Sequence, residues 1–267
     1  MKTIRSFILL MGTLFFAVTI PTGIFAEEGT VPQHAQNAML MSGGRLALSA
    51  ITAYVDGQIE GMARLLGTMA ETKEVKSGNW DRMKPLLVEV KRHSIPSVIF
   101  FAHTDGSYFT VERGAVDRNI KDRPYFSMVM SGNVSFGQLV ISRSTGKYVA
   151  IAAVPVRDKG RVVGLLGASI YLEELNEQVL KVLQLPENVI FYVLDQEGIT
   201  ALHFWKQYIF QDPAKLDSPS LARAVKEIMT KREGYVSYEF MGKPRDLIYM
   251  TSAITGWHYV LGVMREE

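Results

Sequence analysis

The chain of 267 residues contains no cysteine. This absence excludes disulfide bonds, thiolate metal ligands and a thiol nucleophile, so stability must come from packing. Neither charge is in large excess, because 29 Lys and Arg stand against 27 Asp and Glu, a formal net charge of +2. No basic cluster is dense enough to follow a phosphate backbone. We therefore expect no nucleic-acid partner.

Motifs of common catalytic and metal sites are also missing. The five histidines show neither HxH nor HxxxH spacing, and the sequence contains no G-x-S-x-G. The glycines of GLLG, residues 164–167, lie in a strand-like run and indicate sheet packing rather than a phosphate loop. We predict a protein that is not an enzyme, with no catalytic residues, no metal and no cofactor.

One long apolar run is present, at the start of the chain. A basic beginning (MKTIR), an uncharged stretch and a small residue, Ala26, predict a secretory signal peptide over residues 1–26. The stretch from Phe7 to Ala26, about 20 residues, is also long enough for an uncleaved membrane anchor. Pro21 and Gly23 interrupt its last turns and favour cleavage. Either interpretation places the rest of the chain outside the cytoplasm, in the periplasm or the extracellular space.

Helical periodicity dominates the next stretch, from Gln33 to about Lys76. At 1.5 Å per residue this helix would be about 60 Å long, which predicts an elongated molecule. Gly43 and Gly44 are expected either to kink it or to mark its start. A shorter helix is predicted at Asp81–Lys91. The apolar residues that recur at steps of three or four are Ala35, Ala38, Met39, Leu46, Ile51, Tyr54, Val55, Ile59, Met62, Leu65, Leu66 and Met69.

From residue 97 the pattern changes to short β-type runs. Asp-Gly, Thr-Gly and Lys-Gly pairs separate β-branched segments, which is typical of hairpins. Consecutive strands between residues 138 and 172 predict an antiparallel sheet, with Tyr125–Met130 as a short helix beside it.

The same pattern occurs twice. Residues 98–101 (VIFF) lead to an Asp-Gly turn, and residues 189–192 (VIFY), about 90 residues later, lead to DQEG. A loop, a helix and a terminal hairpin pair follow each time. Two similar α+β units are therefore predicted, joined by a helix at Glu173–Leu183 that Pro186 closes.

Several short segments in a fixed order carry a resemblance to a known family. They are RPYF at 123–126, SRSTGK at 142–147, VPV at 154–156, GLLGASIYL at 164–172 and VLDQEG at 193–198. With this order and spacing, the chain from about residue 35 to its end resembles the double Cache (dCache, tandem PAS-like) extracellular sensor domain of bacterial chemoreceptors and sensor kinases. The resemblance implies an α+β fold, in which a long N-terminal helix precedes two PAS-like antiparallel-sheet units.

The resemblance also implies a division of the chain. After the signal peptide, the long and short helices occupy residues 33–92. A membrane-distal PAS-like unit with the ligand pocket follows at 93–172, a connecting helix at 173–185, and a membrane-proximal PAS-like unit at 186–267.

In that family an Arg followed by two aromatics forms part of the pocket wall of the distal unit. The resemblance therefore implies that Arg123, Tyr125 and Phe126 line a ligand cavity between the sheet and the short helix. Phe101, His103 and Gln138 are candidates to face the same cavity from neighbouring strands. Strand alternation alone leaves open which face is inside.

The sequence departs from the amino-acid-binding subgroup of the family. Ser169 and Ser142 stand where that subgroup has aspartates, and Val140 stands in place of a tyrosine; both serines remain candidates to line the pocket. A partly buried guanidinium binds a carboxylate through two parallel hydrogen bonds. An α-ammonium group needs a buried counter-charge, which is not visible here. We expect a small organic acid or another carboxylate-bearing anion rather than an amino acid.

Two alternatives stay open. Arg123 could pair with Asp117 or Asp122 while Tyr125 and Phe126 fill the core. The chain could also be a structural partner domain that forms a homodimer through its long helix and takes no ligand. If the chain is a sensor, we expect it to bind a small-molecule ligand and to have a membrane receptor or a sensor kinase as its protein partner.

Overall fold

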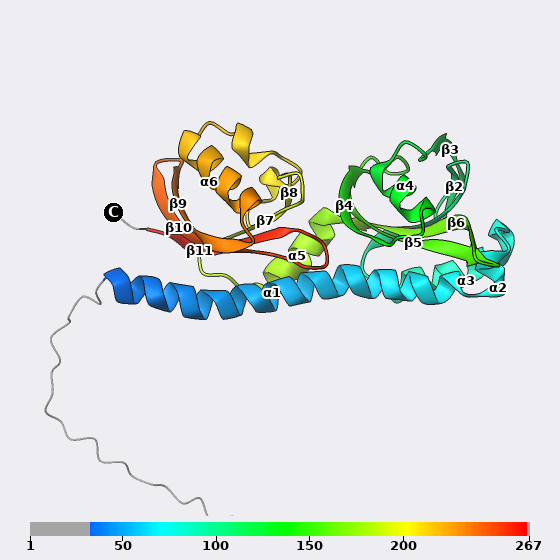
Figure 1. The fold of residues 1–267 in the computed structure, drawn as a ribbon, viewed down its shortest axis with the longest axis horizontal. Helices are drawn as coiled ribbons and strands as arrows, with labels where there is room; N and C mark the ends of the chain where they lie inside the picture. Colours follow the sequence, from blue (N-terminus) through cyan, green and yellow to red (C-terminus); the bar gives the residue numbers. More distant parts are fainter. Residues whose placement is uncertain (1–32, 266–267) are drawn as a thin grey trace, which may run out of the picture.

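The computed structural model describes residues 33–265, with side chains from residue 43 onward. The predicted signal peptide lies outside the described residues. One long helix runs along two antiparallel sheets that lie side by side (Figure 1), which confirms the α+β architecture predicted from the sequence. Among the described residues, no helix combines the length and the apolar character that a membrane crossing requires.

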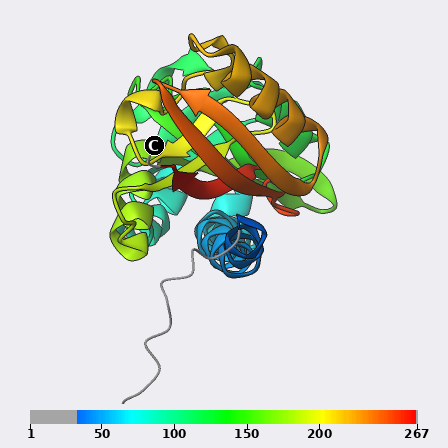
Figure 2. The same cartoon turned by 90° about the vertical axis from the view of Figure 1, so that its left-hand side faces the viewer.

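Helix α1 (Gln33–Ala70) spans both sheets on one side (Figures 1 and 2). It continues through Gly43 and Gly44, so these glycines do not mark its start. The helix ends earlier than the predicted Lys76, because the Thr72 hydroxyl accepts a hydrogen bond from the Val75 amide and caps a separate short helix, α2 (Lys73–Lys76). Its buried stripe consists of Leu48, Ile51, Val55, Ile59, Met62, Ala63 and Leu66.

Helix α3 (Trp80–Arg92) follows and corresponds to the predicted shorter helix. The Asn79 side chain accepts a hydrogen bond from the Arg82 amide and caps its first turn. Met83, Leu87 and Val90 are buried and place the helix against the first sheet.

The first sheet has six antiparallel strands in the order β3-β2-β1-β6-β5-β4. Its short helix α4 (Pro124–Met130) lies on the face away from α1 (Figure 1). Strand β3 was not predicted, because its sequence GAVDRN has little β character and its side chains are largely exposed. The strands are β1 (Ser97–His103), β2 (Ser107–Thr110), β3 (Gly114–Asn119), β4 (Ser135–Ile141), β5 (Tyr148–Asp158) and β6 (Arg161–Tyr171).

The second sheet repeats this topology. Its order, β8-β7-β11-β10-β9, matches β2-β1-β6-β5-β4 of the first sheet strand for strand. Helix α5 (Leu172–Leu183) joins the two units, and α6 (Pro219–Thr230) takes the place of α4. The strands are β7 (Val189–Leu194), β8 (Thr200–His203), β9 (Glu233–Phe240), β10 (Lys243–Thr251) and β11 (His258–Met264), with two 3-10 turns, η1 (Lys206–Tyr208) and η2 (Pro213–Lys215).

The core is divided by the sheets. One cluster lies between α1 and the near faces of both sheets, and two separate clusters lie under α4 and under α6. Side chains of β1 alternate between these layers: Ile99 and Phe101 belong to the α1 side, and Phe100 and Ala102 to the α4 side. Any cavity beneath α4 or α6 is therefore separated from α1 by a sheet.

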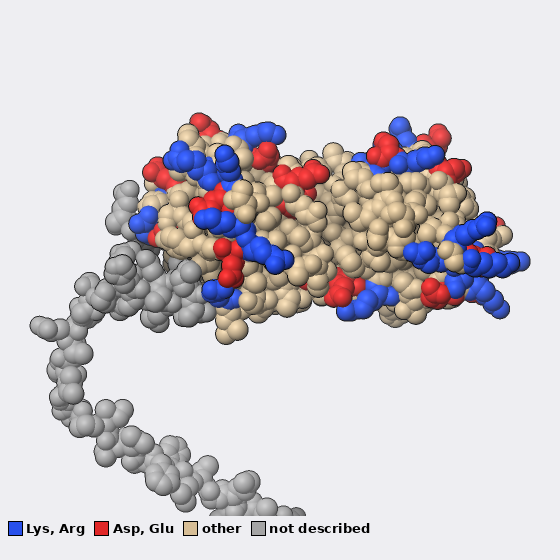
Figure 3. Space-filling model, viewed as in Figure 1, with Lys and Arg blue, Asp and Glu red and all other residues tan. Residues whose placement is uncertain are grey.

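Two sets of contacts fix the units to each other and to α1. The buried Asp56 of α1 accepts hydrogen bonds from Ser252 at 2.6 Å, Thr255 at 3.2 Å and Tyr259 at 3.0 Å, all in the second unit. The Trp257 indole of the second unit donates to the Gly137 carbonyl of the first unit at 3.0 Å. On the face shown in Figure 3, acidic and basic side chains are interspersed toward both ends of the molecule.

Candidate functional site

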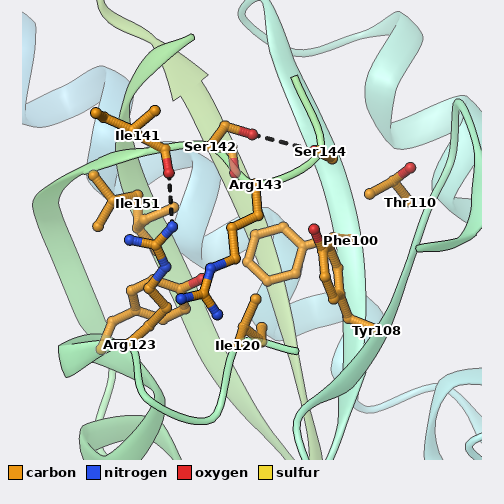
Figure 4. A pocket seen from close by; sticks show the side chains of 13 residues that line it. Phe100, Tyr108, Thr110, Ile120, Arg123, Ile141, Ser142, Arg143, Ser144 and Ile151 are labelled. Carbon is orange, nitrogen blue, oxygen red and sulfur yellow. Dashed lines mark hydrogen bonds between the residues drawn. The ribbon is translucent and has the colours of Figure 1, made fainter. Parts of the chain in front are cut away.

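A cavity lies on the first sheet, on the face away from α1 (Figure 4). The cavity is narrow and opens to solvent on one side. Strands β1, β2, β4, β5 and β6, the start of α4 and the β4–β5 turn contribute side chains. The lining residues are Phe100, Tyr108, Thr110, Ile120, Arg123, Tyr125, Val140, Ile141, Ser142, Arg143, Ser144, Ile151 and Ser169.

Arg123 immediately precedes α4. Its backbone is extended, with φ −74° and ψ 136°, and Pro124 occupies the first helical position, so the arginine is held at the entrance of the helix. The half-buried guanidinium donates one hydrogen bond, to the Ile141 carbonyl at 2.9 Å (Figure 4). Within the described residues it forms no ion pair, and Asp117 and Asp122 do not pair with it. Four of its five N–H groups remain available to a ligand.

Arg143 is a second cation at this cavity, and it is already paired. From the β4–β5 turn it donates two hydrogen bonds of 2.7 Å to the Asp122 carboxylate and a third to the Asn119 carbonyl. The hydrogen bonds from Arg143 lower the pKa of Asp122. This bidentate pair ties the turn to the segment before α4.

Hydroxyl groups supply most of the remaining polar surface. Ser142 and Ser144 lie 3.2 Å apart, oxygen to oxygen, and Ser169 is contributed by β6. Burial raises the pKa of the Tyr108 phenol, and burial raises that of Tyr125 further. Both phenols therefore stay protonated at neutral pH and can donate hydrogen bonds.

Apolar side chains form the floor of the cavity. Phe100 and Ile151 project from β1 and β5 to the α4 side of the sheet. A Cβ atom at Gly167 would lie 2.4 Å from the Phe100 ring, so a glycine is needed there for the ring to lie over β6. The cavity thus combines an apolar floor with a cationic and hydroxyl-rich rim.

Four of the eight residues predicted from the sequence line this cavity. Arg123 and Tyr125 come from the start of α4, Ser142 from the β4–β5 turn and Ser169 from β6. Sequence reasoning missed Arg143, Tyr108, Thr110 and Ser144. Arg143 and Ser144 directly follow Ser142 in the SRSTGK segment, and this adjacency could have indicated that they line the same cavity.

The other four predicted residues lie elsewhere. Phe126 packs in the core under α4. Phe101 points to the α1 side of β1, and His103 shares that face, with its ring 5.1 Å from that of Phe101. Gln138 lines a groove between the two units, beside Gln196 and Trp257. Strand alternation accounts for Phe101 and His103, since they lie two residues apart and on the opposite face from Phe100.

The charge balance of the cavity is one-sided. Two arginines line it, and no Asp or Glu is among the described lining residues. The neighbouring Asp122 is occupied by Arg143. A carboxylate would find a donor in Arg123, whereas an ammonium group would find no counter-charge.

The fold and this site can now be set beside known proteins. The Cache domain family model matches residues 33–267. The chain belongs to the double Cache family. Cache domains are extracellular sensor domains that bind small molecules in chemoreceptors and sensor kinases, and they are not catalytic. A comparison with curated proteins gives no match.

Solved structures share the fold of this Cache domain at low sequence identity. "Methyl-accepting Chemotaxis protein X" is 16% identical, with a TM-score of 0.69 over 86% of this chain and 100% of that chain. The ligand-binding domain of Pseudomonas aeruginosa PctB, in complex with L-Arg, is 16% identical, with a TM-score of 0.65 over 85% of this chain and 96% of that chain. The ligand-binding domain of the Pseudomonas fluorescens chemoreceptor CtaA, in complex with L-serine, is 13% identical, with a TM-score of 0.67 over 86% of this chain and 100% of that chain.

Proposed function

We propose that this Cache domain is an exported sensor module whose first unit binds a small organic acid through Arg123. The observation that carries the proposal is a half-buried guanidinium with one backbone partner, Ile141, in a cavity whose described lining residues include no Asp or Glu. A carboxylate that accepts from the remaining donors of Arg123 would form charge-assisted hydrogen bonds and thereby stabilise the folded protein.

The hydroxyl-rich rim refines the class of ligand. Tyr108, Thr110, Ser142, Ser144 and Ser169 can each donate or accept a hydrogen bond. A hydroxy acid or a dicarboxylate, such as lactate, malate or succinate, matches this rim better than a purely apolar acid. The PctB and CtaA domains were solved in complex with amino acids, L-Arg and L-serine. No Asp or Glu is among the described residues that line the cavity of this chain, which favours acids without an amine.

We propose a membrane receptor or sensor kinase as the partner that reads this binding. Ligand on Arg123 would tie α4 to β4, while β5 and β6 pack on α1 through their other face. A shift of the sheet would thereby reach α1. The structural alternative, a homodimer through α1 without ligand, has less support: among the described side chains of α1, Leu46 is the one large apolar group that is mostly exposed.

Thermal unfolding of the purified mature chain tests the binding. Lactate, malate and succinate are compared with their amides at equal ionic strength, in the wild type and in Arg123→Gln. At least one acid should raise the unfolding midpoint, its amide should not, and Arg123→Gln should lose the shift, because the amide side chain removes the bidentate donor.

Arg157→Gln provides the matched control. Arg157 also donates one hydrogen bond to a backbone carbonyl, that of Gly132 at 3.0 Å, but it does not line the cavity. This variant should keep the full shift. An equal shift in Arg123→Gln and the wild type would remove Arg123 from the site.

A further inference from the structure

The second unit carries a cavity at the corresponding place of the repeated topology, on the face away from α1 and beside the start of α6. This cavity is narrow and opens to solvent on one side, so a ligand larger than water would need its side chains to move apart. Five of its eleven lining residues carry aromatic rings, in contrast to the hydroxyl-rich first cavity. The lining residues are Tyr192, Thr200, His203, Tyr208, Gln211, Pro213, Leu216, Leu221, Tyr238, Phe240 and Arg245.

Arg245 of β10 is the charge in this cavity, and it is only 2% exposed. Its Nε has no hydrogen-bond partner among the described residues, and one terminal nitrogen donates a long bond of 3.4 Å to the Phe240 carbonyl. The next residue, Asp246, points to the other face of the strand, where it binds Arg265, Tyr235 and Ser237. No Asp or Glu lines the described cavity.

Aromatic rings surround the guanidinium. Its central carbon lies 5.0 Å from the ring centre of Phe240, 5.6 Å from Trp205 and 5.9 Å from Tyr238. Cation–π contacts of this kind compensate part of the cost of burial. They engage the flat face of the guanidinium and do not occupy the N–H donors in its plane. An arginine held only for structure would be expected to spend those donors on protein acceptors.

Neutral donors face the same space. The Tyr192 hydroxyl is buried close to that of Tyr238, with no well-aligned hydrogen-bond partner among the described residues. His203 Nδ1 accepts a hydrogen bond from the Trp205 amide at 2.8 Å, so in the neutral ring Nε2 carries the proton and is a donor. Burial, aided by the charge of Arg245, lowers the pKa of His203 to about 3, and the ring is neutral at neutral pH. The cavity therefore has one fixed positive charge and several neutral donors.

We propose that this cavity is a second ligand site, in which Arg245 binds the carboxylate of a small monocarboxylate and the aromatic walls hold its apolar body. The guanidinium supplies the paired donors for the carboxylate, and Tyr192 supplies a third donor beside it. The rings of Tyr238 and Phe240 favour an alkyl or aryl group over the hydroxylated ligands suited to the first cavity. The two units would thus sense acids of different polarity.

The test uses sodium butyrate and sodium benzoate as probes, with butyramide, benzamide and sodium chloride as controls at equal concentration. Binding is measured by thermal unfolding and by tryptophan fluorescence in Arg123→Gln, which disables the first cavity. Butyrate or benzoate should raise the unfolding midpoint, and the amides and chloride should not. The fluorescence change should be lost in Trp205→Phe, because this indole lies against Arg245.

Two further variants decide the role of Arg245. Arg245→Met removes a buried charge that lacks an acidic partner, so the ligand-free variant should be at least as stable as the wild type and should lose the response. Arg245→Lys keeps the charge without the planar fork and should bind about tenfold more weakly. A response equal to that of the wild type in both variants, an equal shift by chloride, or no shift in Arg123→Gln would overturn the proposal. Strong destabilisation of ligand-free Arg245→Met would assign Arg245 a structural role instead.

Discussion

Asp56 is the residue on which the contact between α1 and the second unit is centred. It is a buried acid that accepts three hydroxyl hydrogen bonds, from Ser252, Thr255 and Tyr259. Burial raises its pKa above the ordinary value of 3.8, and the hydroxyl donors offset only part of that rise. The folded protein therefore holds this proton to a higher pH than the unfolded chain does.

This pKa shift predicts a pH dependence that Asp56→Asn should remove. The raised pKa contributes stability that is fully present below the unfolded pKa and is lost as the pH rises through the folded pKa. The free energy of unfolding of the wild type, minus that of Asp56→Asn, should fall as the pH rises above about 4 and then level off. Urea unfolding of both proteins between pH 4 and pH 8 measures this difference. A difference that is constant or rises with pH would show that burial does not destabilise the ionised form of Asp56.

At single residues, sequence patterns predicted part of the candidate site. Arg123, Tyr125, Ser142 and Ser169 were expected at the pocket from the resemblance to the Cache family, not from local periodicity. Arg143 was not expected there, because its position depends on Asp122, which lies 21 residues away. The face of Phe101 stayed open at the level of sequence, since β1 is buried on both sides and its sequence shows no polar alternation; the residue lies on the α1 side.

Among the strands, β4 makes a direct hydrogen bond to the second unit. A bulge at Gly137, with φ +73°, lets the strand present its carbonyl to the Trp257 indole. A Cβ atom at this position would lie 3.0 Å from that indole. Both the backbone conformation and the close approach therefore require glycine.

Gly137→Ala should lower the free energy of unfolding by about 1–3 kcal/mol more than a matched glycine substitution does. The control is Gly160→Ala, which has a similar φ of +79° and nothing within 4 Å of the added Cβ atom. Urea unfolding of the two variants separates the backbone cost, which they share, from the contact with Trp257. Equal losses would mean that this contact contributes little to stability.

Secondary structure was largely predictable where periodicity was strong. The sequence predicted α1, α3, α5 and the central strands of both sheets to within a few residues. Strand β3 and the end of α1 were not predicted. Strand β3 is an exposed edge whose partner is β2, and the break after Ala70 depends on the Thr72 cap, a local contact that hydrophobic periodicity does not report.

At the scale of the whole molecule, the two units share one helix and one core cluster. The internal repeat in the sequence predicted two units, and the matching strand orders confirm that they have the same topology. Their cavities differ in chemistry: hydroxyls surround Arg123, and aromatic rings surround Arg245. This difference could not be read from the repeat, because the side chains that line each cavity come from loops and strands far apart in the sequence.

The central claim is that the first unit recognises an acid without an amine. Isothermal titration calorimetry of the purified protein with matched pairs, L-lactate against L-alanine, L-glycerate against L-serine and L-malate against L-aspartate, tests it most directly. Each pair differs only by a hydroxyl in place of the ammonium group. The hydroxy acid of at least one pair should bind about tenfold or more tightly than its amino acid, and Arg123→Gln should lose that binding. Tighter binding of the amino acid would contradict the claim.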